Sequence, residues 1–324
     1  MNKSRENFPH MCAWLLGVIV WFTAYPGPVI GQDAPPDQSV ESGQEPAAQE
    51  GPENPEAAPA AEPKKRRFLK RIGPQQLTPE QQEEAERLRK LAAKFGTDPT
   101  AIVGRVQLSS AYYDFPDGVR ATETVARVDL PFKGDYLLRV EAPFLRWSDP
   151  NLAGAPSESG FSDLLVTAGW RVYNKPEYAV LVGVVSSLPT AAETGLGLGK
   201  YTVGPTVATA RVLPDWDTFL IGLFTQQFSV GGDPSRKDID FSRFSLAMTT
   251  LWTGNWWSTA QTVLVTDWER KAKTGMTFEL EVGRNVVGTW GVFARPGVGL
   301  FGQGVGGTYD WNIEAAIRRT FKSF

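Results

Sequence analysis

Apolar and polar side chains alternate in long segments between residues 102 and 321. In residues 308–321, for example, Tyr309, Trp311 and Ile313 alternate with polar residues. A β-strand places successive side chains on opposite faces, so each segment has one apolar and one polar face. These segments run for about twelve to fourteen residues, whereas strands of soluble proteins usually have about five or six. A tilted strand needs roughly nine to eleven residues to cross a bilayer, so the pattern predicts membrane-spanning strands.

The alternating region divides into about twelve strands. We predict them at 102–115, 119–132, 136–147, 160–173, 178–189, 200–213, 218–230, 241–252, 256–268, 276–287, 290–301 and 308–321. Tight turns follow the even-numbered strands, and longer loops follow the odd-numbered ones, except for the short turn at Pro116. This arrangement is typical of outer-membrane barrels. The predicted fold class is therefore an all-β, transmembrane, antiparallel up-and-down β-barrel in the outer membrane, with both termini in the periplasm.

Pro205 and Pro296 lie inside predicted strands. Proline cannot donate a ladder hydrogen bond. Both positions therefore predict bulges or local breaks in the ladder.

Tryptophan and tyrosine residues gather at the ends of the predicted strands. Those at periplasmic ends are Tyr136, Tyr173, Tyr178, Trp216, Trp252, Trp256, Trp257 and Trp290, and those at external ends include Trp147, Trp268 and Tyr309. Such residues favour the level of the lipid headgroups. A soluble core would not sort them to strand ends, so we expect an aromatic girdle in contact with outer-membrane lipid.

Residues 1–31 have the features of a secretory signal peptide. A cationic start precedes an apolar run from Cys12 to Tyr25, and small Gly31 follows a Pro-Gly-Pro breaker. The apolar run has about fourteen residues, fewer than the roughly twenty that a spanning helix needs. We expect cleavage after Gly31, export, and insertion by the barrel-assembly machinery.

A linker and one helix lie between the signal peptide and the barrel. Residues 32–73 are rich in Pro, Ala and Glu, which predicts disorder, and their basic cluster at 64–71 is either a solvated charge run or a contact with anionic lipid or cell-wall polymer. Residues 74–98 contain a predicted periplasmic helix from Pro79 to about Lys94, with Thr78 as its N-cap. Its apolar stripe is formed by Ala85, Leu88, Leu91, Ala92 and Phe95. The stripe predicts either weak docking on a neighbour or insertion into the barrel mouth as a plug.

The only histidine and the only cysteine, His10 and Cys12, lie in the predicted signal peptide. The mature chain therefore lacks disulfides, Cys/His zinc sites and histidine-dependent catalysis. Outer-membrane phospholipases and proteases need such chemistry, so we predict no enzyme activity, no metal and no cofactor. A net charge of −3 gives no reason to expect a nucleic-acid partner. A translocator for a passenger domain is the third class, but the leader is too short for a convincing passenger.

Three stretches resemble the outer-membrane family called "MetA-pathway of phenol degradation". They are Gly160-Phe161-Ser162-Asp163-Leu164, Ser187-Leu188-Pro189-Thr190, and residues 195–205 with a Gly-Leu-Gly-Leu-Gly-Lys run. Ser162 and Ala191 stand where the family usually has glycine. The resemblance covers most of residues 105–321 and implies an outer-membrane barrel, with uptake linked to aromatic degradation. The same glycine run lacks the pattern of a Walker A loop, so we expect an external loop there.

The polar faces of the strands would line the lumen. The charged residues of this pore-lining set are Arg105, Arg127, Arg139, Glu141, Arg171, Arg243, Glu279, Glu281, Arg295, Glu314 and Arg318. A barrel of twelve strands is intermediate in width between eight-stranded barrels, whose interior is filled by side chains, and barrels of sixteen or more strands, which hold an open channel. We therefore expect a channel or transporter that passes small polar or aromatic-acid solutes by diffusion through a narrow lumen. The alternative is a filled or plugged structural or docking barrel, in which these charges merely pair.

Overall fold

The computed structural model describes residues 77–132, 134–152 and 155–321. The predicted signal peptide, the linker at 32–73 and the basic cluster at 64–71 lie outside the described residues. The elements are α2 (Pro79–Phe95), β1 (Gly104–Asp114), β2 (Arg120–Phe132), β3 (Tyr136–Asp149), β4 (Glu158–Gly160), β5 (Leu164–Asn174), β6 (Tyr178–Leu188), β7 (Lys200–Leu213), β8 (Thr218–Gly232), β9 (Asp240–Leu251), β10 (Trp256–Asp267), β11 (Lys273–Val287), β12 (Trp290–Phe301) and β13 (Trp311–Phe321). Short 3₁₀ turns are η1 (Pro116–Gly118), η2 (Pro214–Trp216) and η3 (Thr253–Asn255).

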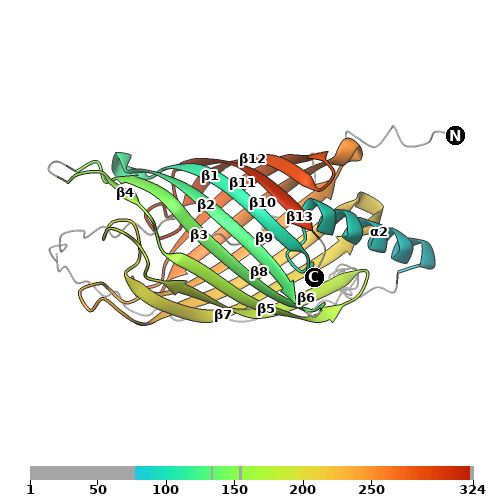
Figure 1. Ribbon diagram of the computed structural model, residues 1–324, viewed down its shortest axis with the longest axis horizontal. Coiled ribbons are helices and arrows are strands. Elements are labelled where there is room, and N and C mark those ends of the chain that lie inside the picture. The colour runs from blue at the N-terminus through green and yellow to red at the C-terminus, as the bar shows by residue number, and fades with distance from the viewer. Residues whose placement is uncertain (1–76, 133, 153–154, 322–324) are drawn as a thin grey trace, which may run out of the picture. The chain divides into compact units, whose positions relative to one another are not determined.

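The strands form a closed antiparallel barrel (Figure 1). Of the thirteen strands in the described part of the chain, all except the three-residue β4 form the ring, which leaves twelve. Consecutive strands pair, and β1 pairs with both β2 and β13, so the ring has no free edge. The predicted fold class is confirmed. In a closed ring, the backbone N–H and C=O groups of every strand have hydrogen-bond partners in a neighbouring strand. An open edge would leave such groups unpaired within the bilayer.

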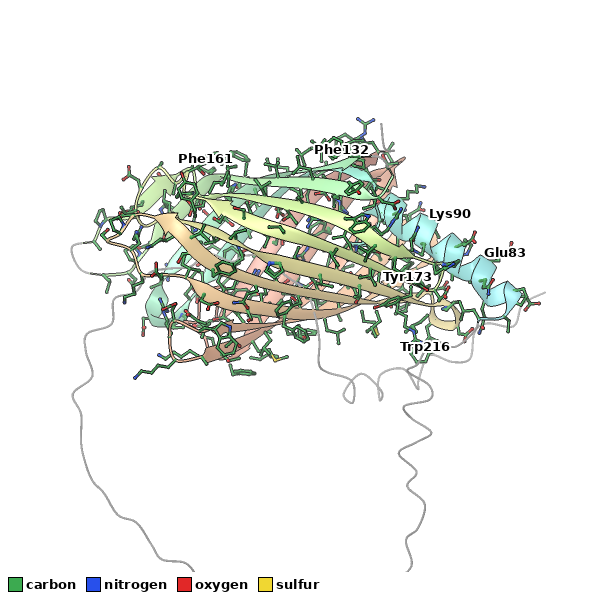
Figure 2. The ribbon with its side chains drawn as sticks, turned by 90° about the horizontal axis from the view of Figure 1, so that it is seen from below. Glu83, Lys90, Phe132, Phe161, Tyr173 and Trp216 are labelled. Atoms are coloured by element: carbon green, nitrogen blue, oxygen red, sulfur yellow. The ribbon has the colours of Figure 1, made fainter. Side chains whose placement is uncertain are left out.

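The alternation in the sequence becomes two faces in the barrel. In β1, Val106 and Leu108 are 50% and 45% exposed, whereas Arg105 and Gln107 are 6% and 3% exposed. The outer surface is therefore apolar and suited to lipid, and the polar side chains point into the lumen. Figure 2 shows Trp216 projecting outward at the end of the barrel that carries α2.

The predicted strand at 160–173 is interrupted in the structure. Gly160 ends β4, which pairs with the outer part of β3, and β5 begins only at Leu164. Between them, the Asp163 carboxylate accepts hydrogen bonds from the backbone N–H groups of Ala191 and Leu198, at 3.1 and 2.5 Å. These loop contacts draw residues 161–163 away from the ladder. Three predicted strand starts also differ by two or three residues, because β1 begins at residue 104 instead of 102, β11 at 273 instead of 276 and β13 at 311 instead of 308.

Both strand prolines coincide with local ladder breaks. Pro205 pairs with β6 but has no partner in β8, although the register is the same on either side. Pro296 likewise pairs with β13 but has no partner in β11. The bulges lie elsewhere, for example between Thr124 and Val125.

Helix α2 presents its apolar stripe to the barrel. Ala85, Leu88 and Ala92 are fully buried and Phe95 is 2% exposed, and the helix contacts β13, β7 and η2. It lies at one end of the barrel (Figure 1), the end that we expect to face the periplasm. Among the described residues, no helix combines the length and the apolarity needed to cross a membrane.

Candidate solute-conducting lumen

The inward faces of β11, β12, β13, β1, β2 and β3 form a charged wall, since these strands are consecutive neighbours in the ring. One ion-pair network on this wall centres on Asp129, which is 1% exposed. Arg127 Nη2 lies 2.8 Å from one carboxylate oxygen of Asp129, Arg105 Nε lies 3.4 Å from the same oxygen, and Arg139 Nε lies 2.9 Å from the other. Arg127 also reaches Glu141 at 3.8 Å. The aspartate therefore compensates three neighbouring guanidinium groups.

The second network on the charged wall centres on Arg295. Its guanidinium lies 2.7 Å from Glu281, 3.3 Å from Glu314 and 3.6 Å from Glu279. Two aromatic side chains complete it. Trp257 Nε1 donates to Glu281 at 2.6 Å, and the Tyr309 hydroxyl donates to Glu279 at 2.5 Å. Arg318 adds an ion pair with Glu281 at 3.5 Å. Such a network is stable only when each charged group has a partner of opposite charge, because an unpaired buried charge is strongly destabilising.

The inward faces of β5 to β10 form a neutral wall opposite the charges. Its side chains are mainly aliphatic residues and threonines, including Leu165, Thr167, Leu181, Val185, Thr206, Ala208, Leu223, Thr225, Ala247, Thr249, Val263 and Val265. Charges at the strand ends are paired, Arg171 with Asp135 and Lys200 with Asp238. Arg243 of β9 is the exception at depth, since it is 3% exposed and forms no ion pair, although Glu279 of the charged wall attracts it at longer range.

A cavity of about 70 Å³ lies between the two walls. Leu165, Leu181 and Leu223 line it from the neutral wall, and Arg139 and Glu141 line it from β3. Since one buried water needs about 10–15 Å³ by this measure, the cavity has room for about five to seven waters. The lumen is thus narrow and partly filled by its own side chains.

Residues 79–103, which we call the plug segment, lie at the mouth that we expect to face the periplasm, and their C-terminal part fills it. Ile102 packs against Leu137, Leu181, Ala208 and Leu223, which belong to four different strands. Phe95 lies against the ring of Trp257, with centroids 5.7 Å apart. The backbone carbonyl of Lys94 accepts a hydrogen bond from Thr320 Oγ1 at 2.6 Å. The end of α2 and the residues after it therefore occupy the lumen below the cavity.

The plug segment is held together internally. Arg89 of the helix reaches Asp98 at 3.3 Å and Thr100 at 3.2 Å, and both residues are buried. Asp98 also accepts hydrogen bonds from the backbone N–H and the hydroxyl of Thr100, at 2.8 and 2.6 Å. These bonds join the helix to the following turn, so the two form one unit.

Polar contacts at the rim are fewer and more exposed. Gln81 donates to Asp215 at 3.2 Å, Arg87 lies 3.2 Å from Asp217, and Arg89 donates to the backbone carbonyl of Lys175 at 2.7 Å. Partial burial raises the pKa of the Asp217 carboxyl, while the positive charge of Arg87 opposes that rise. Exposed ion pairs of this kind contribute about 0–1 kcal/mol each. The apolar contacts inside the mouth therefore carry most of the docking free energy.

Two external loops fold inward at the other mouth. Leu196 is fully buried, and its carbonyl accepts a hydrogen bond from Arg146 at 3.0 Å. Val305 packs on Val263 and Val265. The lumen is therefore narrowed at both ends, by these loops at one mouth and by the plug segment at the other.

The structure places the predicted pore-lining residues on the inward face, with Arg171 near the end of β5, where its side chain is 17% exposed and paired with Asp135. Their part in solute passage stays a prediction. Sequence reasoning missed Asp129, although it alternates with Arg127 on the same polar face. It also missed buried Arg146, because the bulge between Thr124 and Val125 pairs Val125 with Pro143 and shifts the parity of outer β3.

The aromatic prediction is wrong at Tyr309 and Trp257. Tyr309 is 3% exposed and packs on Tyr113 inside the barrel, and Trp257 is fully buried in the lumen. Consecutive strand residues point to opposite faces, so only one of Trp256 and Trp257 can face lipid. The remaining girdle residues, Tyr136, Tyr173, Tyr178, Trp216, Trp252, Trp256, Trp268 and Trp290, are exposed, and Trp147 is half-buried.

No family model matches the sequence, and no curated protein matches it. Among solved structures, the COG4313 outer membrane channel from Pseudomonas putida F1 superposes with a TM-score of 0.53 and 12% identity, covering 68% of this chain and 94% of that one. The NanC porin superposes with a TM-score of 0.50 and 10% identity, covering 67% of this chain and 100% of that one. The chain has the fold of outer-membrane barrels. At these identities the likeness concerns the fold alone, so the resemblance to the phenol-degradation family stays a prediction.

Proposed function

We propose that this protein is an outer-membrane channel that passes small polar or aromatic-acid solutes by passive diffusion, and that the plug segment closes it at the periplasmic mouth. The supporting observation is the unfilled cavity between the charged wall and the neutral wall, whose lining includes the residues that pack on Ile102, namely Leu137, Leu181, Ala208 and Leu223. Removal of the plug segment from the mouth would join this cavity to the periplasm. A solute would then pass between Arg and Glu side chains on one side and apolar side chains on the other.

The competing function is a filled structural or docking barrel. The ion pairs around Asp129 and Arg295 favour it, because paired charges fill space and need no solute. The cavity and the separate plug segment favour the channel. A barrel filled only for stability would gain from packing this space, since unfilled volume forfeits contacts between its lining atoms.

A reversible disulfide lock tests the channel within the intact chain. A Cβ added at Gly96 would lie 3.1 Å from Thr320 Cγ2, so Gly96→Cys with Thr320→Cys places two thiols within bonding reach. Gly96 has φ +69, which costs the variant about 1 kcal/mol locally but leaves room for the bond. The predicted mature chain has no other cysteine.

We expect the oxidised double variant to be silent in planar bilayers and the reduced form to show channel openings. The single variant Thr320→Cys controls for the lost hydrogen bond to Lys94. Equal conductance in both redox states would show that the plug segment does not close the pore. Silence of the reduced protein and of variants with a weakened plug would favour the filled barrel.

A further inference from the structure

Arg243 is a buried cation without an ionic partner. It is 3% exposed, its Nε has no hydrogen-bond partner, and within the described residues no carboxylate oxygen lies within 4.0 Å of its guanidinium. Burial of a charge in this way is unfavourable unless a partner arrives. The contrast with Arg139 is direct, because Arg139 also lines the cavity but pairs with Asp129 at 2.9 Å.

The surroundings of Arg243 direct it towards the cavity. On one side the backbone of the 302–308 loop covers it so closely that a Cβ added at Gly307 would lie 2.3 Å from Nη2. On the other side it lines the cavity together with Leu165, Leu181 and Leu223. The lining of the cavity therefore combines a cation that has no ion pair with several apolar side chains.

We propose that this cavity is a binding site for a small monocarboxylate with a short apolar body. The carboxylate pairs with the Arg243 guanidinium, whose planar fork suits two parallel hydrogen bonds. The apolar body packs on the leucines of the neutral wall. This site rests on the proposed function, because a solute reaches the cavity only through the lumen.

Size and charge narrow the ligand class. Room for about five to seven waters corresponds to a ligand of about five to seven heavy atoms, such as butyrate. Glu141 also lines the cavity, whereas Arg139 in the same lining is already paired with Asp129 at 2.9 Å, so a second carboxylate on the ligand would meet a negative group without an unpaired cation. Dicarboxylates and cationic analogues of similar length are therefore disfavoured.

Isothermal titration of the purified mature barrel with butyrate tests the site. We expect Arg243→Gln to weaken butyrate binding at least tenfold and Arg284→Gln, a surface substitution beside Trp256, to leave it unchanged. Succinate and butylammonium should bind at least tenfold more weakly than butyrate. Heat-modifiable migration of each variant on a detergent gel verifies that the barrel is closed.

A second variant tests the apolar side independently. Leu223→Ala enlarges the cavity and should shift the preferred ligand from butyrate towards hexanoate. Equal butyrate affinity in Arg243→Gln and in the unmodified protein overturns the proposal. Equal binding of acetate, chloride and butyrate also overturns it, because it would show a simple anion site. An unchanged preference for ligand chain length in Leu223→Ala overturns it as well.

The site and the channel can fail separately. Butyrate binding that depends on Arg243 in a barrel that never conducts would retain the site and reject the channel. Conductance that responds to the disulfide lock, with butyrate binding unaffected by Arg243→Gln, would retain the channel and reject the site.

Discussion

Replacing Ile102 by alanine should open the channel without unfolding the barrel. Ile102 is 9% exposed and contacts Leu137, Leu181, Ala208 and Leu223, yet it lies before β1 and makes no ladder pair. Ile→Ala changes in cores cost about 2–5 kcal/mol. The lower part of that range, about 2–3 kcal/mol, applies here because the adjacent cavity lets the neighbouring side chains relax.

This loss falls on plug docking, because Ile102 contacts the barrel only in the docked state. A change of about 2–3 kcal/mol raises the ratio of open to closed molecules by about 30- to 150-fold. Single-channel recording should therefore show a much higher open probability at an unchanged unit conductance. The temperature at which the barrel unfolds and its migration on a detergent gel shifts should stay the same, since the strand pairing is intact.

The matched control is Ile317→Ala, which removes the same atoms from the outer surface, where Ile317 is 42% exposed. It should leave the open probability unchanged. An Ile102→Ala protein that closes as completely as the Ile317→Ala protein would refute the docking argument. Loss of heat-modifiability in Ile102→Ala would instead show that the plug segment is needed for the barrel to close.

Three further predictions concern the wall and its charges. Leu280→Arg should cost about 2–4 kcal/mol in folding into lipid vesicles, because Leu280 is 42% exposed on the lipid face; a cost near zero would contradict that assignment. Arg295→Gln should destabilise the barrel by about 3–5 kcal/mol, since it leaves Glu279, Glu281 and Glu314 without their shared cation. The temperature at which the barrel unfolds and changes its migration on a detergent gel measures the loss of stability and should fall. An unchanged temperature would show that other donors pair with the three carboxylates. In the open Ile102→Ala background, Arg243→Gln should shift the reversal potential towards cations, because it removes fixed positive charge from the lumen; an unchanged potential would place the ion path elsewhere.

Strand pairing could be predicted because it depends on a local property of the sequence. Alternation with a period of two is visible within each segment, and the tight turns after even-numbered strands fix the order. The predicted bounds of the strand at 290–301 coincide with β12, where no loop competes for the backbone. At 160–163 the same alternation fails, because hydrogen bonds from the loop at residues 191–198 hold Asp163 away from the ladder.

The lumen was harder to predict because it depends on which side chains meet across the barrel. The alternation of polar and apolar residues was enough to place Arg127 and Glu281 on the inward face, and the structure shows both side chains buried. It could not show that one aspartate pairs with three arginines, or that Arg243 forms no ion pair with either network. The sequence offered a plug only as one of two alternatives, since the apolar stripe of α2 also fits docking on any apolar surface.

The division of the lumen into two walls makes a movable plug physically reasonable. The ion pairs around Asp129 join β1, β2 and β3, and those around Arg295 join β11, β12 and β13, so both networks lie within the barrel itself. Release of the plug segment breaks apolar contacts of Ile102 and Phe95, the Lys94 hydrogen bond and a few exposed rim pairs. It separates none of those ion pairs, and so it leaves no carboxylate of the charged wall without its cation. The barrel can therefore stay rigid while the plug segment exchanges between docked and released states, which is what a two-state gate requires.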